Sequence, residues 1–360
     1  MARTKPSKFH ASMLLVWPGM WLLVLGELGS RISPEWLPWL APFGLTHALG
    51  WVMVAMGFLW RLVSFRWMKV VVPAAALAVT WPSFNRVFSI GDEFVVKAQT
   101  EGWGLLTFNV RRLDEFEWLE GEPTRAELAQ WLKERDEFVW CFQEFPSDGK
   151  AMLANVQFSF RKQGHRLVAW PDGAGPAVST SLPVLRSNPW MFDDGAGKGR
   201  VMEMDVQSPD GPVRIFNVHL QSLYFSEEDY MAVEQGPTKE EGKRLWTMLM
   251  HAYQGRALQS NALREAMEAS PYPVIVAGDF NDSPVSYAMR RLTGSRVRDA
   301  FTVAPIGLGG THLGTIPGLR IDGVLVDTTL ACTAFKTHQI ELSDHRPVSV
   351  NVWSLSGENP

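Results

Sequence analysis

Residues 273–284 read Pro273-Val274-Ile275-Val276-Ala277-Gly278-Asp279-Phe280-Asn281-Asp282-Ser283-Pro284, a short apolar run that ends in a group of polar side chains. The run from Val274 to Ala277 is too short for a helix and lies between prolines, as is typical of a buried strand. Asp279 and Asn281 follow two residues apart, so in an extended backbone both side chains leave the same face. The alternative is a simple Asx turn after the strand, because Asp, Asn, Ser and Pro all favour turns.

A carboxylate beside an amide at the end of a strand suits the hydrolysis of phosphoesters. Asp279 is placed to orient and deprotonate a water molecule. Asn281 is placed to donate a hydrogen bond to a phosphoryl oxygen or to hold the carboxylate. The pair alone does not separate this chemistry from turn formation, so the rest of the chain decides.

Polar residues recur where other predicted strands end. A strand over 104–110 carries Asn109 near its end, and a strand over 138–142 is followed by Gln143-Glu144. A hairpin over 201–206 and 213–218 ends at His219. Strand ends are where sheet-based enzymes assemble their sites. The full set of candidates is Asn109, Glu144, His219, Asp279, Asn281, Asp322, Asp344 and His345.

Composition divides the chain in two. Residues 1–90 contain two acids, Glu27 and Glu35, and eight Lys and Arg, whereas residues 91–360 carry a formal charge of −10 within a total of −4. We therefore predict an apolar N-terminal part over 1–90, a linker over 91–102 and an enzyme domain over 103–355.

Three apolar stretches in the N-terminal part predict about three transmembrane helices, at roughly 11–26, 36–60 and 70–84. The middle stretch carries no Asp, Glu, Lys or Arg and is long enough to cross a bilayer. The first and third are shorter, and each contains a proline. The alternative is a buried helical hairpin of a soluble protein.

The positive residues of the short loops predict the orientation. Arg3, Lys5 and Lys8 precede the first stretch, and one Arg lies between the first and second. Three positive residues separate the second from the third, and Arg86 alone follows. This alternation places the N-terminus in the cytoplasm and, with three spans, the C-terminal domain outside it. If the third stretch only lies at the interface, the domain is cytoplasmic instead.

The chain resembles the endonuclease/exonuclease/phosphatase superfamily in a set of short motifs over about residues 103–353. They occur in the order Asn109, Gln143-Glu144, His219, Gly278-Asp279-Phe280-Asn281, Arg320-Ile321-Asp322 and Ser343-Asp344-His345-Arg346-Pro347. The resemblance implies an α/β (α+β) fold, a four-layer sandwich of two mainly antiparallel sheets flanked by helices. With the apolar helices in front, the chain looks like a membrane-anchored, deoxyribonuclease-like branch of that family.

The resemblance also implies a division of labour. Glu144 matches the main metal ligand, and its hard oxygen suits Mg²⁺, with Mn²⁺ possible. Asn109 and Asp344 are expected to complete the metal site, together with or beside Asp279, which positions the attacking water.

Asp322 and His345 match the family's Asp–His pair, in which the carboxylate fixes the imidazole tautomer and raises its pKa. His219 matches a histidine that protonates the leaving oxygen or stabilises the pentacovalent state, and the sequence shows no carboxylate partner for it. Arg111 and Asn281 are the expected substrate contacts. Gly323 departs from the family, where many members carry an aromatic residue or histidine, and this loosens any inference about the substrate.

These features predict a membrane-anchored, Mg²⁺-dependent hydrolase of a phosphodiester in a nucleic acid or a phospholipid head group. The acidic domain argues mildly against a nonspecific DNA binder. A local cluster of Arg290, Arg291, Arg296 and Arg298 favours phosphate contacts, unless it is a solvated helix face. The alternative function is a non-catalytic, membrane-tethered binding domain of the same fold. Nothing in the sequence indicates a protein partner.

Overall fold

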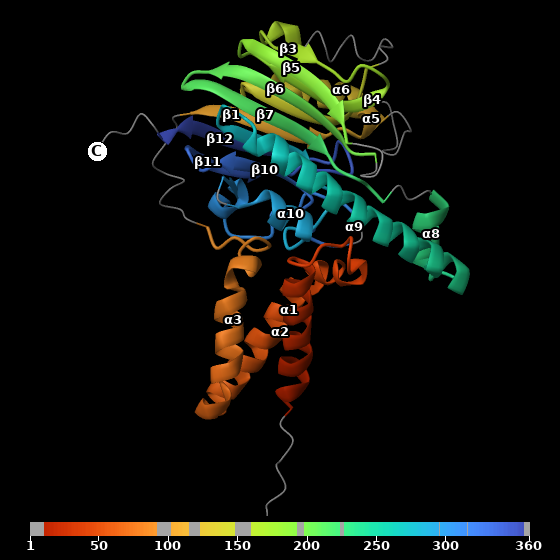
Figure 1. Cartoon of the computed structure of the whole chain (residues 1–360), viewed down its shortest axis with the longest axis vertical. Coiled ribbons are helices and arrows are strands. Elements are labelled where there is room, and N and C mark those ends of the chain that lie inside the picture. Colours follow the sequence, from red (N-terminus) through yellow and green to blue (C-terminus); the bar gives the residue numbers. More distant parts are fainter. Residues whose placement is uncertain are drawn as a thin grey trace, which may run out of the picture.

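A computed structural model describes the chain over residues 11–91, 102–114, 123–147, 160–192, 198–223, 227–294, 296–314 and 316–355. Figure 1 shows a bundle of three helices, here called the stalk, below a larger domain of sheets and helices. Most of the linker predicted over 91–102 lies outside the described residues.

The stalk consists of α1 (Met13–Gly29), α2 (Phe43–Val63) and α3 (Val71–Phe84), with short 3₁₀ turns at Pro38–Leu40 and Trp67–Lys69. Glycines bring α1 and α2 close together. A Cβ atom at Gly19 would lie 2.9 Å from the Gly50 carbonyl oxygen, and one at Gly50 would lie 2.9 Å from the Gly19 oxygen. Contacts of this kind let helix backbones approach closely, as is common in membrane proteins.

Two stretches of the stalk, Pro38–Val63 and Trp67–Phe84, are long and apolar enough to cross a membrane, and Met13–Gly29 is a shorter apolar helix. In the most apolar 18-residue segment of each of the two longer stretches, only 28% and 22% respectively is buried inside the molecule. A core helix of a soluble protein is mostly buried, so this exposure disfavours the soluble hairpin considered above.

The larger domain contains two six-stranded sheets. The first sheet has the strand order β11 (Leu330–Thr337), β12 (Val348–Ser354), β1 (Trp103–Asn109), β2 (Val139–Pro146), β4 (Ala174–Thr180) and β3 (Arg166–Val168). The second has the order β5 (Val184–Met191), β6 (Arg200–Ser208), β7 (Gly211–His219), β8 (Val274–Asp279), β10 (Asp322–Asp327) and β9 (Val297–Asp299).

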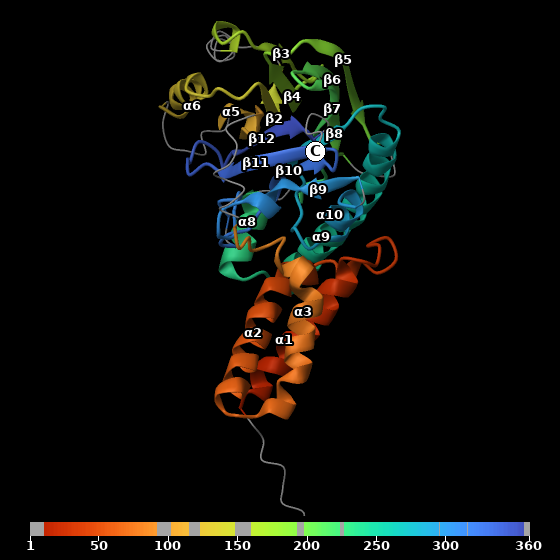
Figure 2. The same cartoon turned by 90° about the vertical axis from the view of Figure 1, so that its left-hand side faces the viewer.

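The sheets pack face to face, and helices cover their outer faces (Figure 2). One apolar cluster between the sheets includes Leu105 and Ile275. A second lies between the second sheet and the helices α9 (Lys239–Glu268) and α10 (Tyr287–Leu292). A third lies between the first sheet and α6 (Pro123–Lys133). These four layers confirm the predicted sandwich.

Each sheet has one parallel pair of strands near its centre, and the remaining pairs are antiparallel. β1 runs parallel to β2 with Asn109 opposite Gln143. β7 runs parallel to β8 with His219 opposite Asp279. The carboxyl ends of both pairs therefore open at the same edge of the sandwich, and this edge holds the polar residues predicted above.

The stalk contacts the larger domain at several places, and the segment after α3 joins it through the backbones of Ser89 and Gly307. A Cβ atom at Gly44, near the start of α2, would lie 2.3 Å from the Val285 carbonyl oxygen, in the loop that follows β8. Ala41 packs in a small cluster with Met250 and Tyr253 of α9. A capping box formed by Thr238 and Glu241 is present at the start of α9.

Candidate active site

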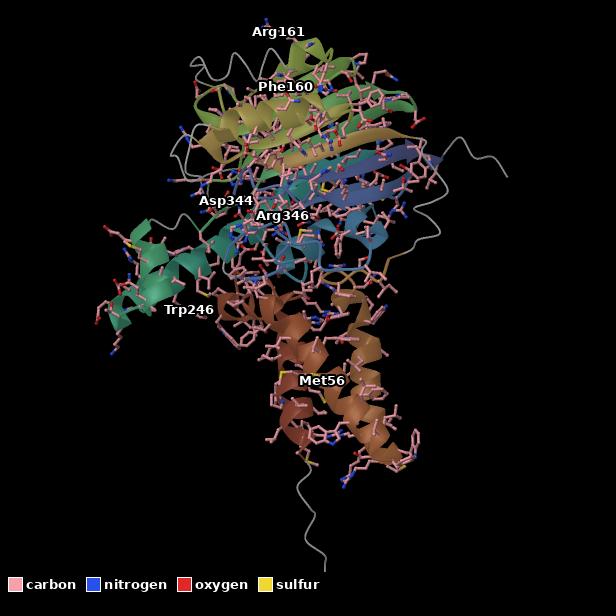
Figure 3. All side chains as sticks on the ribbon, turned by 180° about the vertical axis from the view of Figure 1, so that it is seen from behind. Met56, Phe160, Arg161, Trp246, Asp344 and Arg346 are labelled. Carbon is pink, nitrogen blue, oxygen red and sulfur yellow. The ribbon has the colours of Figure 1, made fainter. Side chains whose placement is uncertain are left out.

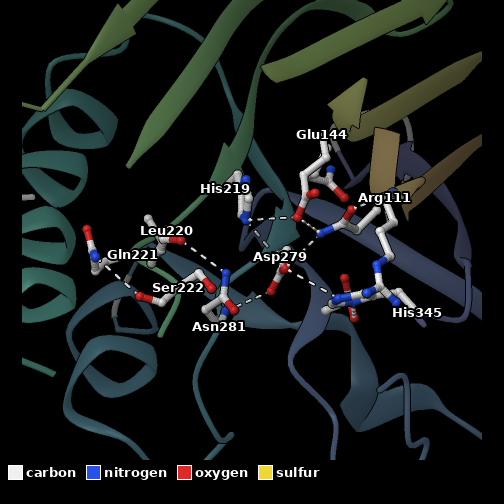
Figure 4. A network of polar contacts seen from close by, with 12 residues as sticks. Arg111, Glu144, His219, Leu220, Gln221, Ser222, Asp279, Asn281 and His345 are labelled. Carbon is white, nitrogen blue, oxygen red and sulfur yellow. Dashed lines mark hydrogen bonds and ion pairs between the residues drawn. The ribbon is translucent and has the colours of Figure 1, made fainter. Parts of the chain in front are cut away.

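The polar residues predicted from strand ends converge at one edge of the sandwich (Figure 4). Asn109 ends β1, Glu144 lies near the end of β2, and His219 and Asp279 end β7 and β8. Asp322 begins β10 directly opposite Asp279, because these two strands are antiparallel. Asp344 and His345 lie in the loop before β12.

Asp279 is at the centre of the hydrogen bonds and is 1% exposed. Its Oδ1 accepts the backbone N–H of Asn281 at 2.8 Å, and its Oδ2 accepts the Asn109 side-chain amide at 3.1 Å. The first bond is an Asx turn, so the turn and the site are the same structure. Asn281 lies beyond the strand with φ of 51°, and its amide donates to the Leu220 carbonyl oxygen at 3.0 Å.

His345 is held between two buried carboxylates. Its Nδ1 lies 2.8 Å from Asp322 Oδ2, and its Nε2 lies 3.8 Å from Asp279 Oδ2. Burial alone would lower the pKa of His345, but Asp322 and then Asp279 outweigh it and raise the pKa to about 10. The imidazole is therefore cationic at neutral pH, which agrees with the Asp–His pairing expected from the sequence.

For Asp279, burial shifts the pKa upward, whereas for His345 burial alone shifts it downward. Burial, and then the neighbouring Asp322 carboxylate, raise the pKa of Asp279, while the His345 and His219 rings oppose the rise. A carboxylate with a raised pKa is a stronger base than an exposed one, and the two rings beside it limit the rise.

Glu144 and His219 face each other across the site. Glu144 has φ of 51° beside a β-bulge between Phe142 and Phe145, and this irregularity turns its side chain toward the second sheet. His219 Nε2 lies 3.7 Å from Glu144 Oε1 and 3.8 Å from Asp279 Oδ2. The structure thus gives His219 two carboxylate neighbours, which the sequence did not reveal.

Arg111 joins the rim of the site to Asp344. Its guanidinium lies 3.2 Å from Asp344 Oδ2, and its backbone N–H donates to Asn109 Oδ1 at 3.0 Å. The backbone at Arg111, Arg112 and Leu113 has positive φ, so the chain turns sharply after β1. The side chains of Arg111 and Glu144 are each 32% exposed, so both remain accessible from solvent.

Two sets of residues offer ligands for a divalent cation. Asp279, Asp322 and His345 present ligand-capable atoms within 4.8 Å of one another. In that set His345 Nδ1 already bonds Asp322 Oδ2 at 2.8 Å. Glu144 and Asp344 instead offer partly exposed carboxylates, the donors that Mg²⁺ prefers. The oxygen of Asn109 faces Arg111, so in this conformation the Asn109 amide donates to Glu144 rather than offering a ligand.

Two polar residues that sequence reasoning missed support the site. Asn217, on β7, donates to the Phe142 and Ala177 carbonyl oxygens of the facing sheet at 2.8 Å each. Gln143 completes this bridge by donating to Asn217 Oδ1 at 2.7 Å. His312 lies beside His345 with 5.3 Å between ring centroids, and its Nδ1 is buried without a partner among the described residues. In the sequence, the only sign of His312 was the Thr311-His312 pair, which lies ten residues before the Ile321-Asp322 motif.

The predicted arginine cluster does not form one phosphate-binding face. Arg296 binds Asp327 at 3.2 Å, and Arg298 donates to the Leu330 carbonyl oxygen at 3.0 Å, so both stabilise the sandwich. Arg290 and Arg291 lie instead at the stalk side of α10. At Gly323 a Cβ atom would lie 3.0 Å from the Arg320 guanidinium, so this glycine leaves room for the ion pair of Arg320 with Asp299.

The sequence matches the model of the Endonuclease/Exonuclease/phosphatase family over residues 106–345. No curated protein matches the chain. Many solved structures share the fold, and three of them, all at low identity, illustrate the range. A family protein from Bacteroides thetaiotaomicron is 14% identical with a TM-score of 0.54, covering 71% of this chain and 98% of its own.

The other two structures are of a named phosphatase and of the catalytic domain of a named human protein. The mannosyl-6-phosphatase of Bacteroides thetaiotaomicron is 14% identical with a TM-score of 0.51, covering 70% of this chain and 99% of its own. The human Nocturnin catalytic domain is 12% identical with a TM-score of 0.52, covering 71% of this chain and 95% of its own. At these identities the similarity shows the shared fold.

Proposed function

Because the chain belongs to the endonuclease/exonuclease/phosphatase family of metal-dependent phosphoester hydrolases, we propose that it is a membrane-anchored, Mg²⁺-dependent phosphodiesterase. The observation that carries this proposal is the environment of Asp279. Asn109, Asn281 and two histidines surround one buried carboxylate at the open edge of the sandwich. Such a group is suited to activating water beside a phosphoryl centre.

We assign the metal to Glu144 and Asp344, with Asn109 orienting the carboxylates or turning its oxygen inward. A bound Mg²⁺ ion would neutralise charge on the phosphoryl oxygens. Arg111 holds Asp344 from the rim and is placed to meet a phosphate that displaces it. Mn²⁺ has the same preference for oxygen ligands and is the alternative ion.

The residues around Asp279 divide the remaining work. Asp279 orients the attacking water and takes its proton, while the Asx turn with Asn281 fixes the carboxylate. His345 carries a positive charge toward the phosphoryl oxygens and owes that charge to Asp322. His219, on the other side of Asp279, gives a proton to the leaving oxygen.

The arrangement of the stalk supports an anchor over 1–90 and a catalytic domain over 103–355. α1 ends at the sandwich, α2 returns to the far end and α3 comes back, so the start of α1 and the catalytic domain lie at opposite ends (Figure 1). An odd number of passes, with Arg61, Arg66 and Lys69 at the far end, supports a cytoplasmic location of that end. The catalytic domain then lies on the extracytoplasmic side.

The substrate is a phosphodiester of a nucleic acid or of a phospholipid head group. The anchor favours the head group, because it keeps the site near the bilayer surface. The formal charge of −10 over residues 91–360 disfavours tight, nonspecific binding of duplex DNA.

The test is a substrate panel on the full chain in detergent micelles, with Mg²⁺, Mn²⁺ or excess chelator. The panel contains plasmid DNA, RNA, sphingomyelin, phosphoinositides and bis-p-nitrophenyl phosphate. We expect metal-dependent cleavage of at least one diester, lost in Asp279→Asn. Turnover that is unchanged by the chelator or in Asp279→Asn would refute the proposed chemistry.

A further inference from the structure

A cationic cavity of about 250 Å³ lies where the stalk meets the sandwich, on the side of α10 away from the first sheet. Four arginines line it: Arg31 just after α1, Arg264 of α9, and Arg290 and Arg291 of α10. Tyr287 of α10 adds a phenol to the same lining. None of these residues belongs to the active site described above.

Two of the four arginines have acidic partners, and the other two have none within the part of the chain that the structure describes. Arg31 binds the Glu27 carboxylate and donates to the Glu27 carbonyl oxygen at 2.9 Å. Arg264 donates to Glu268 at 2.7 Å.

The two arginines of α10 keep their charge uncompensated. Arg291 donates to the neutral side chain of Asn261 at 2.7 Å. Among the described residues the guanidinium of Arg290 makes no hydrogen bond or ion pair. The cavity therefore has an excess of positive charge.

Neighbouring cations increase this excess. Burial, and then the Arg290 cation, lower the pKa of Arg31. Burial lowers the pKa of Arg86, at the end of α3, where Asp299 opposes the effect and Arg290 adds to it. Positive groups that repel one another at a junction of three elements are stabilised when an anion binds between them.

An apolar groove of about 630 Å³ leads away from the cationic cavity along the stalk. Leu23 and Val24 of α1 and Val72, Ala75 and Val79 of α3 are among its walls. Arg31 lines the groove as well as the cavity. Along α3 the lining spans roughly 15 Å by helical rise, which is about the hydrocarbon thickness of one leaflet.

We propose that the groove and the arginine cavity together bind one anionic phospholipid, with an acyl chain between α1 and α3 and the phosphate beside Arg290 and Arg291. The apolar groove and the adjoining positive charge match the two parts of such a lipid, and a free phosphate would use only the second. Figure 2 shows the groove helices directly below α10, where a head group of the adjacent leaflet would lie. The inference goes beyond the hydrolytic site and rests on the proposed membrane anchor.

The test uses native mass spectrometry of the full chain purified in detergent, with phosphatidylglycerol and phosphatidylcholine added in equal amounts. We expect phosphatidylglycerol to remain bound in preference by about tenfold, because basic residues near a membrane surface attract anionic lipids. Arg290→Gln with Arg291→Gln should reduce the preference to less than about twofold. Arg290→Gln alone should reduce it in part, and this variant breaks no contact of the described fold.

Two controls separate the parts of the proposal. Arg161→Gln with Lys162→Gln removes the same charge from exposed positions at the far end of the sandwich, and the preference should be unchanged (Figure 3). Ala75→Phe fills the groove without changing charge, and it should weaken retention of both lipids. Circular dichroism and turnover of a soluble diester check that each variant is folded.

Three outcomes would overturn the inference. One is equal retention of both lipids, and another is an equal loss in the Arg161→Gln and Lys162→Gln control. The third is full retention in Ala75→Phe together with displacement by millimolar inorganic phosphate, which would identify a site for a free anion. Extraction of native membranes with alkaline carbonate keeps the anchor separate: an integrated chain without lipid preference contradicts only this inference, and a released chain contradicts the anchor too.

Discussion

The stalk and the sandwich distribute their side chains in opposite ways. In the sandwich, apolar residues such as Leu105 and Ile275 are fully buried between the sheets. In the stalk, large apolar residues face outward, with Met56 at 54% and Met68 at 91% exposure (Figure 3). Its interior holds glycines and polar groups, including His47 at 0% exposure. Hydrophobic burial thus dominates the packing of the sandwich, whereas in the stalk buried apolar residues such as Val16 and Val54 share the interior with glycines and polar groups.

Polar groups inside the two regions also serve different ends. In the stalk, Arg61 donates to Ser12 at 3.1 Å and to the Lys69 carbonyl oxygen at 2.9 Å, so two of its nitrogens have acceptors. In the sandwich, Asp279 and Asp322 are two buried carboxylates placed opposite each other on neighbouring strands. Like charges in this position cost stability, which is expected at a site built for chemistry. Substitutions at the site in the sandwich should therefore lower turnover, whereas substitutions inside the stalk should lower stability.

The largest effect is expected from Glu144→Gln, which should abolish turnover of every substrate and weaken Mg²⁺ binding. The change removes a negative charge from the proposed metal site while keeping the size of the side chain, and divalent metal sites contribute several kcal/mol to the transition state. Thermal unfolding should be nearly unchanged, because the side chain is partly exposed. Turnover with Mg²⁺ and the dissociation constant of the ion are the measurements.

A matched control for this prediction is Glu265→Gln on the exposed face of α9. It makes the same chemical change in the same domain, and it should leave turnover and Mg²⁺ affinity unchanged. Near wild-type activity in Glu144→Gln would remove Glu144 from the metal site.

The second prediction separates the two histidines beside Asp279. Positioned proton transfer contributes roughly a hundred- to ten-thousand-fold in rate. His219→Ala should therefore lose that factor on an alkyl phosphodiester and much less on a nitrophenyl ester, whose leaving group needs no proton. His345→Ala should cost a similar factor on both, since the phosphoryl charge is common to them. Values of kcat/KM for both variants on both substrates test this.

Equal losses for His219→Ala on the two esters would exclude it as the general acid. Asn217→Ala is a useful companion, because it perturbs the bridge beneath the site without touching either histidine. Its effect should not depend on the leaving group.

Much of the sandwich and of its site follows from local sequence. The runs at Val274 and Val213 are short, apolar and β-branched, and each ends in a polar residue that the fold brings to one edge. The capping box at Thr238 likewise fixes the start of α9 from four residues. In these places one segment carries both the structural and the chemical signal.

What the sequence did not predict depends on distant partners. β5 (Val184–Met191) is an edge strand with a mostly exposed face and with Pro189 inside it, so its pattern is not that of a buried strand. β11 and β9 were missed for a related reason, since one is bulged and the other short. His219 gained carboxylate neighbours, and Asn217 its partners, only when the two sheets packed together. No local pattern encodes contacts between sheets.

The third prediction concerns packing inside the stalk. Gly50→Leu should destabilise the bundle by about 1–3 kcal/mol, the usual cost of overpacking, because its Cβ atom would meet the Gly19 carbonyl oxygen at 2.9 Å. Leu49→Ala, on the 57% exposed neighbour, should change stability far less. Thermal unfolding in detergent measures both. Turnover of a soluble diester should stay within about twofold of wild type in either variant.

The fourth prediction, with the smallest expected effect, tests whether packing of the stalk influences catalysis in the sandwich. Gly44 and Gly57 are both in α2, and a methyl group at either would meet an atom at less than 3 Å. At Gly57 that atom is Cγ2 of Val16, inside the stalk, at 2.4 Å. At Gly44 it is the Val285 carbonyl oxygen at 2.3 Å, with Ser283 Oγ at 3.1 Å.

These contacts predict different consequences for one added methyl group. Gly57→Ala should lower the stability of the stalk and leave turnover unchanged, because Val16 can change rotamer within the bundle. Gly44→Ala must displace the loop that begins at Asn281 and so move the Asx turn that holds Asp279. A shift of this kind should lower kcat on a soluble diester by up to about tenfold with little change in the melting temperature of the sandwich. If both variants keep wild-type kcat, the stalk carries the catalytic domain without influencing its chemistry, and the contact at Gly44 is packing alone.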